Sequence, residues 1–185
     1  MFARRVRSDK MFAFIDETWN PVKGCLHACR YCYAPKYTSG ARSPRLEERE
    51  LARRFRPGSF IFISDLGDLF GGWVPVEWID RVVEVVRRHP DTLFLALTKN
   101  PARYHELVDR LPANVVLGST VETDLDHVAA ELSQAPAPSA RLEAMRVLKW
   151  PAKFISVEPV LRFSSPEEFA SKILSCEPIA VAVGY

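Results

Sequence analysis

The segment Gly24-Cys25-Leu26-His27-Ala28-Cys29-Arg30-Tyr31-Cys32 places three cysteines within eight residues, with the spacing CxxxCxxC. A cubane iron–sulfur cluster has four irons that each take a thiolate, so three cysteines on one loop leave one iron without a protein ligand. A catalytic metal site has such a vacancy for a small molecule, whereas a structural site takes all its ligands from the protein. The spacing therefore predicts a [4Fe–4S] cluster on Cys25, Cys29 and Cys32.

A zinc knuckle is the alternative that the same loop leaves open, with the three thiolates and either His27 or a distant residue as ligands. Zinc motifs usually consist of two separated ligand pairs, and no second CxxC or HxxxH follows in this sequence. A disulfide is disfavoured, because Cys176 is the only other cysteine and the amino terminus does not resemble a secretory signal. We expect a reducing, cytoplasmic environment and a buried Cys176.

Apolar runs rich in branched and aromatic residues follow the cysteine loop, and most do not alternate with polar residues, as in strands buried on both faces. These runs are residues 60–63, 93–97, 115–117, 153–157 and 179–183. Amphipathic segments between them predict helices at 76–88, 101–111, 142–148 and 166–174. With a first strand before the cysteine loop, the pattern predicts an α/β fold of six parallel strands with right-handed crossovers.

The chain of 185 residues, 48% of them hydrophobic, is expected to form one domain over residues 1–185. Residues 1–17 are predicted to be an amino-terminal arm, with 11–15 either an edge strand or part of that arm. Residues 134–139 are predicted to be a surface turn. No apolar run is long enough to cross a bilayer, so no membrane partner is expected. The last strand has no helix after it, which indicates either a homodimer through this edge or a shortened chain.

Positive charge is concentrated in the half of the chain that carries the cysteines. Residues 1–56 contain 13 Lys and Arg against 6 Asp and Glu, and the remainder contains 12 against 17. The arginines of residues 42–56 suit the phosphates of a nucleic acid. We favour a solvated helix face, because glutamates interleave with the arginines and Leu51 and Phe55 are spaced for burial.

The cysteine spacing, with the aromatic Tyr31 directly before the third cysteine, resembles the signature of the radical S-adenosylmethionine (radical-SAM) superfamily. Further blocks resemble a radical-SAM family first noted among phage proteins, which has no assigned substrate. These blocks are residues 18–25 (TWNPVKGC), 64–66, 97–99, 117–122 and 155–159. The resemblance implies an open partial TIM-type (βα)6 barrel. It also implies that S-adenosyl-L-methionine chelates the vacant iron and is cleaved by one electron to a 5′-deoxyadenosyl radical.

Active sites of parallel barrels gather at the carboxyl ends of the strands, where this sequence has polar residues after each run except the last, which Gly184 follows. The resemblance implies that Tyr31 lies against the adenine of the cofactor. It further implies that Ser64 and Asp65 bind the methionine amino group, which suits a hydroxyl and a carboxylate facing an ammonium. The chain lacks the superfamily's common Gly-Gly-Glu at this second strand.

Later strand ends complete the predicted site. By the same resemblance, Ser119 and Glu122 hold the ribose hydroxyls, Glu158 meets the cofactor or substrate, and Gly184 lets the backbone approach the adenine. Lys99 is assigned to the catalytic set with the cysteines, because a lysine there can anchor an anionic substrate or the cofactor carboxylate.

The sequence therefore favours a cytoplasmic radical-SAM enzyme served by an external one-electron donor of the flavodoxin or ferredoxin type. A nucleic-acid lesion or modified base is the substrate suggested by the basic half and a general likeness to photoproduct lyases, while a peptide or small metabolite stays open. The alternative is a non-enzymatic iron–sulfur or zinc module that senses redox state or docks a partner. The strand-end residues favour the enzyme, because a sensor needs only the cysteines.

Overall fold

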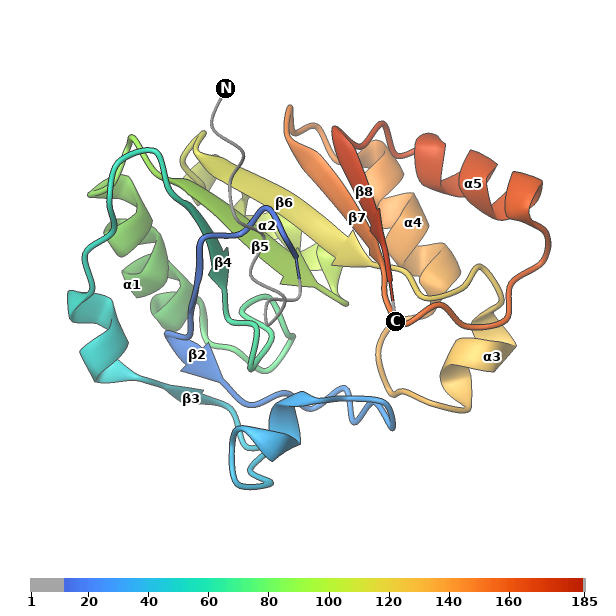
Figure 1. Cartoon of the computed structure of the whole chain (residues 1–185), viewed down its shortest axis with the longest axis horizontal. Coiled ribbons are helices and arrows are strands. Elements are labelled where there is room, and N and C mark those ends of the chain that lie inside the picture. The colour runs from blue at the N-terminus through green and yellow to red at the C-terminus, as the bar shows by residue number, and fades with distance from the viewer. Residues whose placement is uncertain (1–11, 185) are drawn as a thin grey trace.

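The computed structural model describes residues 12–184, which form a curved, six-stranded parallel sheet with helices on its outer side (Figure 1). In spatial order the strands are β1 (Glu17–Trp19), β4 (Phe60–Ile63), β5 (Leu93–Thr98), β6 (Val115–Thr120), β7 (Lys153–Val157) and β8 (Ala180–Val183). Each strand pairs in parallel with the next along the chain, and β1 does not pair with β8. This is the predicted open (βα)6 partial barrel, and the fold-class prediction is confirmed.

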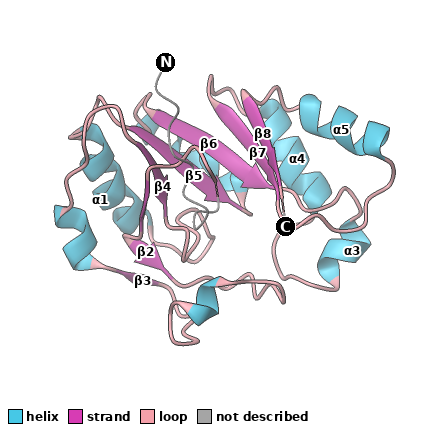
Figure 2. Ribbon diagram, in the orientation of Figure 1, coloured by secondary structure: helices cyan, strands magenta, loops and turns pink. Residues whose placement is uncertain are grey.

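The helices occupy the connections after β4, and Figure 2 shows α1, α4 and α5 along the outside of the sheet. They are α1 (Val76–Arg87), α2 (Tyr104–Leu107), α3 (Asp126–Ala130), α4 (Pro138–Val147) and α5 (Pro166–Leu174). The helix predicted at 101–111 is instead α2 between two 3-10 turns, η3 (Pro101–Arg103) and η4 (Val108–Arg110). The helix predicted at 142–148 begins earlier, because Pro138 stands at its first turn, where proline is favoured.

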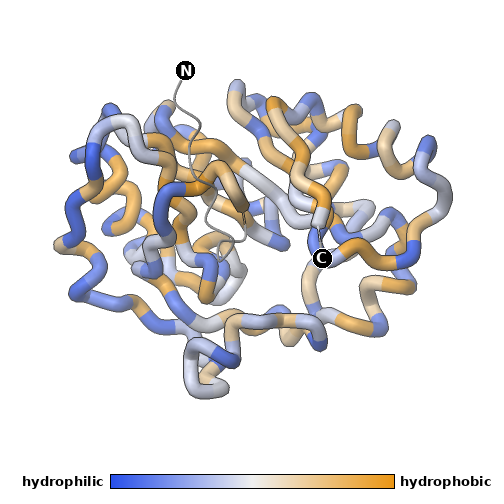
Figure 3. The backbone as a smooth tube through the Cα atoms, in the orientation of Figure 1, coloured by the Kyte–Doolittle hydropathy of each residue, from blue (hydrophilic) through white to orange (hydrophobic). Residues whose placement is uncertain are grey.

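Alternating strand residues build two apolar cores, one on each face of the sheet. Ile61, Phe94 and Leu117 face the helices and belong to the larger core. Phe62, Leu95 and their inward-facing neighbours form a smaller core on the concave side. Figure 3 shows the hydrophobic colour concentrated along the strands and the polar colour in the connections. The sheet is therefore buried on both faces, as the unbroken apolar runs predict.

The segment 12–15 packs under the concave face of the barrel. Its residues form a bend and turn rather than the edge strand considered for 11–15, and Met11 lies outside the described residues. Phe12 and Ile15 are buried, and the Phe12 ring contacts the ring of Phe154 edge-on with centroids 5.5 Å apart. No helix among residues 12–184 is long and apolar enough to traverse a bilayer.

The first crossover, from β1 to β4, contains no α-helix and carries the cysteine loop. Its elements are β2 (Val22–Lys23), η1 (Ala34–Lys36), β3 (Arg45–Leu46) and η2 (Glu48–Ala52). The helix face predicted for residues 42–56 is thus wrong, since a two-residue strand and a 3-10 turn take its place. The predicted local ion pairs are present, because Arg45 contacts Glu47 at 2.9 Å and Arg53 contacts Glu50 at 3.4 Å.

Candidate functional site

The cysteine loop begins at a glycine that no other residue can replace without displacing the backbone. Gly24 has φ +86°, and a Cβ there would lie 2.2 Å from the carbonyl oxygen of Ser43. Its N–H donates to the Leu66 carbonyl at 3.0 Å, and the next N–H, of Cys25, donates to the Arg42 carbonyl at 2.9 Å. The loop is therefore fixed against the connection after β4 and against residues 42–43.

All three cysteines of the loop line one cavity of about 270 Å³ at the carboxyl ends of the strands. Cys29 is buried and Cys25 and Cys32 are half-buried, and none of the three is in a disulfide. Burial, with the nearby Asp68 carboxylate, raises the pKa of the Cys25 thiol to about 12. A cationic metal centre favours the thiolate form, so this environment suits a metal-bound cysteine better than a free thiolate.

The donor set fits a cluster better than a single metal ion. Among residues 12–184, no three His, Cys, Asp or Glu side chains converge as ligands of one ion. The thiolates of a cubane each bind a different iron, which three cysteines on one loop allow. His27, the fourth zinc ligand considered above, is engaged elsewhere, because its Nε2 lies 2.9 Å from Asp68 Oδ2. Cys176 is buried in the core between α4 and α5, as predicted.

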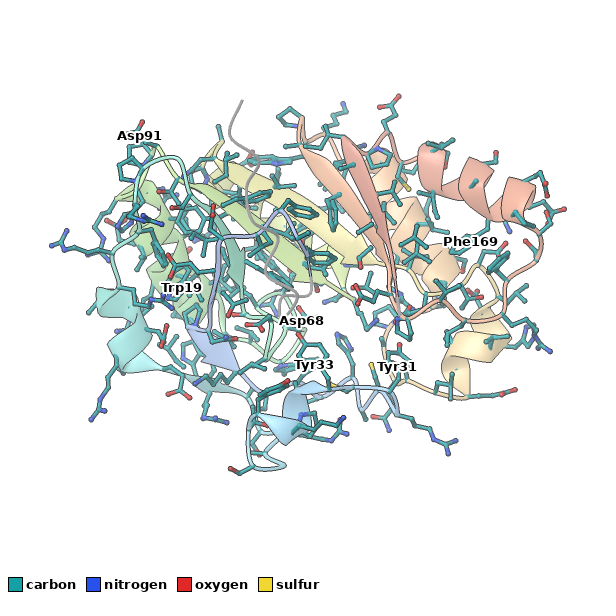
Figure 4. The ribbon with its side chains drawn as sticks, viewed as in Figure 1. Trp19, Tyr31, Tyr33, Asp68, Asp91 and Phe169 are labelled. Atoms are coloured by element: carbon teal, nitrogen blue, oxygen red, sulfur yellow. The ribbon has the colours of Figure 1, made fainter. Side chains whose placement is uncertain are left out.

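Asp68 connects the cysteine loop to the end of β5. Besides His27, its carboxylate accepts hydrogen bonds from the Thr98 hydroxyl at 2.7 Å and from the Lys99 backbone N–H at 3.1 Å. The His27 ring also contacts the Trp73 ring edge-on, with centroids 4.7 Å apart. Figure 4 shows Asp68 near Tyr31 and Tyr33, between the cysteine loop and the sheet. Asp68 therefore positions the loop, a role that its place in the sequence did not reveal.

Ser64 is the most strained residue on the cavity wall. Its backbone has φ +57°, a left-handed conformation that costs a non-glycine residue about 1–2 kcal/mol. Its hydroxyl is buried and has no hydrogen-bond partner among the described residues. Strain and an unsatisfied polar group mark functional positions when they occur together in a cavity.

Asp65 follows Ser64 on the same wall and is held by two neighbours. Asn20 donates to its carboxylate at 2.5 Å, and the Tyr33 hydroxyl donates to its backbone carbonyl at 2.7 Å. Burial raises the pKa of the Asp65 carboxyl above its ordinary value. Desolvation of this kind makes the carboxylate a better partner for a cation that enters the cavity.

Glu122 is the centre of a buried charge cluster behind the cavity wall. Its carboxylate accepts hydrogen bonds from the Tyr31 hydroxyl and the Lys99 ammonium, and from Arg141 Nη1 at 2.7 Å. The side chains of Glu122 and Arg141 are 0% and 1% exposed. Burial and the Arg141 guanidinium lower the pKa of Lys99, and its ammonium lies 5.4 Å from the centre of the Tyr31 ring. Tyr31 and Lys99 line the cavity in front of Glu122.

Most predicted site residues come together around this cavity. Those that line it are Cys25, Cys29, Tyr31, Cys32, Ser64, Asp65, Lys99 and Glu158. Thr120 and Ser156, which had no assigned role, also line it. Sequence reasoning did not assign Tyr33, Arg141 or Asp68 to the site.

Three predicted residues, Ser119, Glu122 and Gly184, do not line the cavity, and their assigned roles stay predictions. Ser119 faces the helix side of β6, where its hydroxyl donates to the Thr98 carbonyl at 3.2 Å. Its neighbour Thr120 takes the inward position, because successive strand residues point to opposite faces. Glu122 is engaged in the charge cluster. A Cβ at Gly184 would lie 3.5 Å from the Glu158 carboxylate carbon, an ordinary van der Waals contact, so Glu158 does not require a glycine at this position.

Comparison with known proteins defines first the class of fold and then the family. Solved structures of spore photoproduct lyase share the partial barrel: a single mutant aligns with a TM-score of 0.62 and 14% identity over 85% of this chain and 49% of that chain. A double mutant with bound AdoMet and dinucleoside spore photoproduct aligns with a TM-score of 0.61 and 13% identity, over 85% of this chain and 49% of that chain. This chain therefore spans about half the length of the lyase.

The family is shown by sequence. A family model described as "Protein of unknown function (DUF5131)" matches residues 10–169, and the chain belongs to this family. No curated protein sequence matches the chain.

Proposed function

We propose that the protein is a radical-SAM enzyme whose [4Fe–4S] cluster is held by Cys25, Cys29 and Cys32. One observation carries the proposal: the three thiols and the unsatisfied Ser64 hydroxyl face the same cavity at the carboxyl ends of the strands. The barrel that the chain shares with spore photoproduct lyase, a radical-SAM enzyme, supports it. The closer likeness to the phage-associated family stays a prediction. When bound, such a cluster supplies one electron that cleaves S-adenosylmethionine to methionine and a 5′-deoxyadenosyl radical.

The polar wall of the cavity suits the methionine part of that cofactor. The Ser64 hydroxyl, which has no partner among the described residues, and the Asp65 carboxylate are acceptors for an ammonium group. The Lys99 ammonium, at the end of the neighbouring strand β5, is a donor for a carboxylate. Glu158 is half-buried at the end of β7, burial raises the pKa of its carboxyl above its ordinary value, and its carboxylate is a further acceptor on the cavity wall.

The chain also provides the shielding that radical chemistry requires. The inner wall below the polar residues is formed by Phe62 and Leu97, and the concave core closes the barrel beneath them. Tyr31 and Tyr33 stand on the side of the cysteine loop, and burial raises the pKa of both hydroxyls, which keeps them protonated. These walls exclude water from the reacting atoms.

A single-stranded nucleic acid, with a damaged or modified base presented to the cavity, is our proposal for the substrate. Residues 21–44, part of which lines the cavity, contain four Lys and Arg and no Asp or Glu. Tyr37 is 71% exposed, and its ring contacts the ring of the cavity-lining Tyr33 edge-on at 6.2 Å. Exposed aromatic rings among cations stack on bases while the cations meet phosphates. A peptide or a small metabolite is the alternative substrate class.

Cofactor cleavage is tested by reconstituting the cluster under nitrogen, adding dithionite and S-adenosylmethionine, and measuring 5′-deoxyadenosine. We expect a brown protein that releases 5′-deoxyadenosine, and loss of both properties in Cys29→Ala. Cys176→Ala is the matched control, because that cysteine is buried far from the cavity. A brown protein that does not bind S-adenosylmethionine supports the non-enzymatic module instead. A colourless protein with stoichiometric zinc contradicts both the cluster and the enzyme.

Substrate class is tested by fluorescence anisotropy with a labelled single-stranded oligonucleotide at several salt concentrations. We expect affinity to fall as salt rises, because phosphate contacts release counterions. Tyr37→Ala should weaken binding by about fivefold to a hundredfold, from the loss of one stacked base, while Tyr37→Phe retains it. Binding that is absent, or equal in both variants, contradicts a nucleic-acid substrate at this loop.

A further inference from the structure

The connection between α3 and α4 holds the cysteine loop from the side opposite to β4. The Arg30 N–H donates to the Leu132 carbonyl at 2.8 Å, and the Gln134 N–H donates to the His27 carbonyl at 2.7 Å. Between these two backbone hydrogen bonds, Ser133 Oγ lies 3.1 Å from Cys29 Sγ. Ser133 is 104 residues from Cys29 in sequence, and no sequence pattern singled it out.

The neighbours of Ser133 direct its hydroxyl hydrogen. The Ala135 N–H donates to Ser133 Oγ at 3.1 Å, which leaves one hydroxyl hydrogen to be placed. The two acceptors in reach are Cys29 Sγ at 3.1 Å and the His27 carbonyl at 3.3 Å. That carbonyl already accepts from Gln134, whereas a metal-bound thiolate is an anionic acceptor that makes the stronger bond. The hydrogen therefore points to sulfur once Cys29 binds iron.

Burial makes this hydrogen bond consequential. Cys29 is 5% exposed, so little water competes for its sulfur. Hydrogen bonds to cluster sulfurs are one of the determinants of an iron–sulfur reduction potential. The reduced cluster carries one more negative charge, so a donor at the thiolate stabilises it more than the oxidised form.

We propose that Ser133 is a positioning residue that orients the Cys29 thiolate and raises the reduction potential of the cluster. The inference rests on the proposed cluster on Cys25, Cys29 and Cys32. It assigns a function to the α3–α4 connection, which the sequence presents only as a surface turn. The higher reduction potential makes electron transfer into the cluster more favourable, although Ser133 does not contact the cofactor.

The test is a redox titration of the anaerobically reconstituted protein, followed by electron paramagnetic resonance. Ser133→Ala should shift the redox equilibrium fivefold to tenfold toward the oxidised form, which lowers the midpoint potential by about 40–59 mV for one electron. Ser133→Thr retains the hydroxyl and should keep the wild-type potential. Ser139→Ala is the matched control, because that serine lies at the start of α4 and its exposed hydroxyl bonds to Asp126 at 2.6 Å.

A second readout separates the hydrogen bond from a general loosening of the loop. After exchange into deuterium oxide, electron–nuclear double resonance of the reduced cluster should show an exchangeable deuteron near sulfur in wild type and Ser133→Thr. Ser133→Ala should lose it. A wild-type potential and an unchanged deuteron signal in Ser133→Ala overturn the proposal while leaving the cluster in place. A protein that takes up no iron overturns both, and iron analysis of the reconstituted protein identifies that case.

Discussion

Replacement of Glu122 by glutamine tests whether the buried charge cluster is structural. The carboxylate is fully buried and accepts from Tyr31, Lys99 and Arg141. Glutamine has the same shape but no charge, so it leaves the Lys99 and Arg141 cations buried without their counter-charge. Breaking one buried ion pair costs about 3–5 kcal/mol. Because two cations share this carboxylate, we expect a loss of about 4–5 kcal/mol in the free energy of unfolding.

The assay is urea unfolding of the metal-free protein, so that metal binding does not contribute to the measured stability. With a slope of about 2 kcal/mol per molar urea, the midpoint should fall by about 2 M. Glu143→Gln is the matched control. Glu143 pairs with Arg146 at 2.6 Å on the same helix as Arg141, but the side chains of Glu143 and Arg146 are both more than half exposed. Solvent screens such a pair, so its removal should leave the midpoint unchanged.

Equal midpoints for Glu122→Gln and Glu143→Gln would refute the reasoning. They would show that Glu122 does not neutralise the two cations and is available to a ligand, which is the ribose-binding role that the family resemblance implies. Retained binding of S-adenosylmethionine by a destabilised Glu122→Gln protein supports the structural role. The two measurements together therefore separate a residue that supports the wall from one that touches the cofactor.

Three further predictions concern the loop, acid stability and assembly. Gly24→Ala should destabilise the protein by more than Gly58→Ala, because both glycines have positive φ but only Gly24 has a backbone atom 2.2 Å from the added Cβ. Thermal unfolding compares the two variants, and equal losses of stability exclude a clash at Gly24. Although burial opposes ionisation, Lys172 and Ser164 lower the pKa of Asp124 to about 2. The unfolded value is about 3.9, so this stability is present above pH 4 and is lost as pH falls toward 2; acid titration of Asp124→Asn should lack that loss. The β8 edge, with Val183 72% exposed, predicts a homodimer by light scattering that Val183→Lys dissociates; a monomeric wild type contradicts it.

The strands and the barrel were predictable because their residues report burial directly. Runs such as Phe60–Ile63 need two buried faces, and only a sheet between layers supplies both. The helix at 101–111 was misread because its apolar spacing is helical while Pro101 and local 3-10 turns divide it. The charged stretch 42–56 was misread because interleaved Glu and Arg occur equally in 3-10 turns and short strands that are held by ion pairs.

For the inward-facing site residues, the sequence indicated which strand end contributes a residue, but not always which residue of that strand faces the cavity. A shift of one position exchanges Ser119 for Thr120, since neighbours in a strand point to opposite faces. The burial of Arg141 could not be predicted from the sequence, because an arginine on an amphipathic helix is normally solvated. Ser133 contacts Cys29 only through the packing of a connection far along the chain. Such contacts depend on tertiary structure, and no local pattern encodes them.

The supports of the cysteine loop constrain the order in which the site is assembled. On one side they come from Leu66, and on the other from Leu132 and Gln134, so the loop is spanned by segments on both sides of β5 and β6. A nascent chain that has emerged only as far as β5 can present the thiols but not their final arrangement. For the proposed cluster, we therefore expect metal delivery to be coupled to completion of the fourth crossover, because iron offered earlier would meet a loop that lacks part of its support.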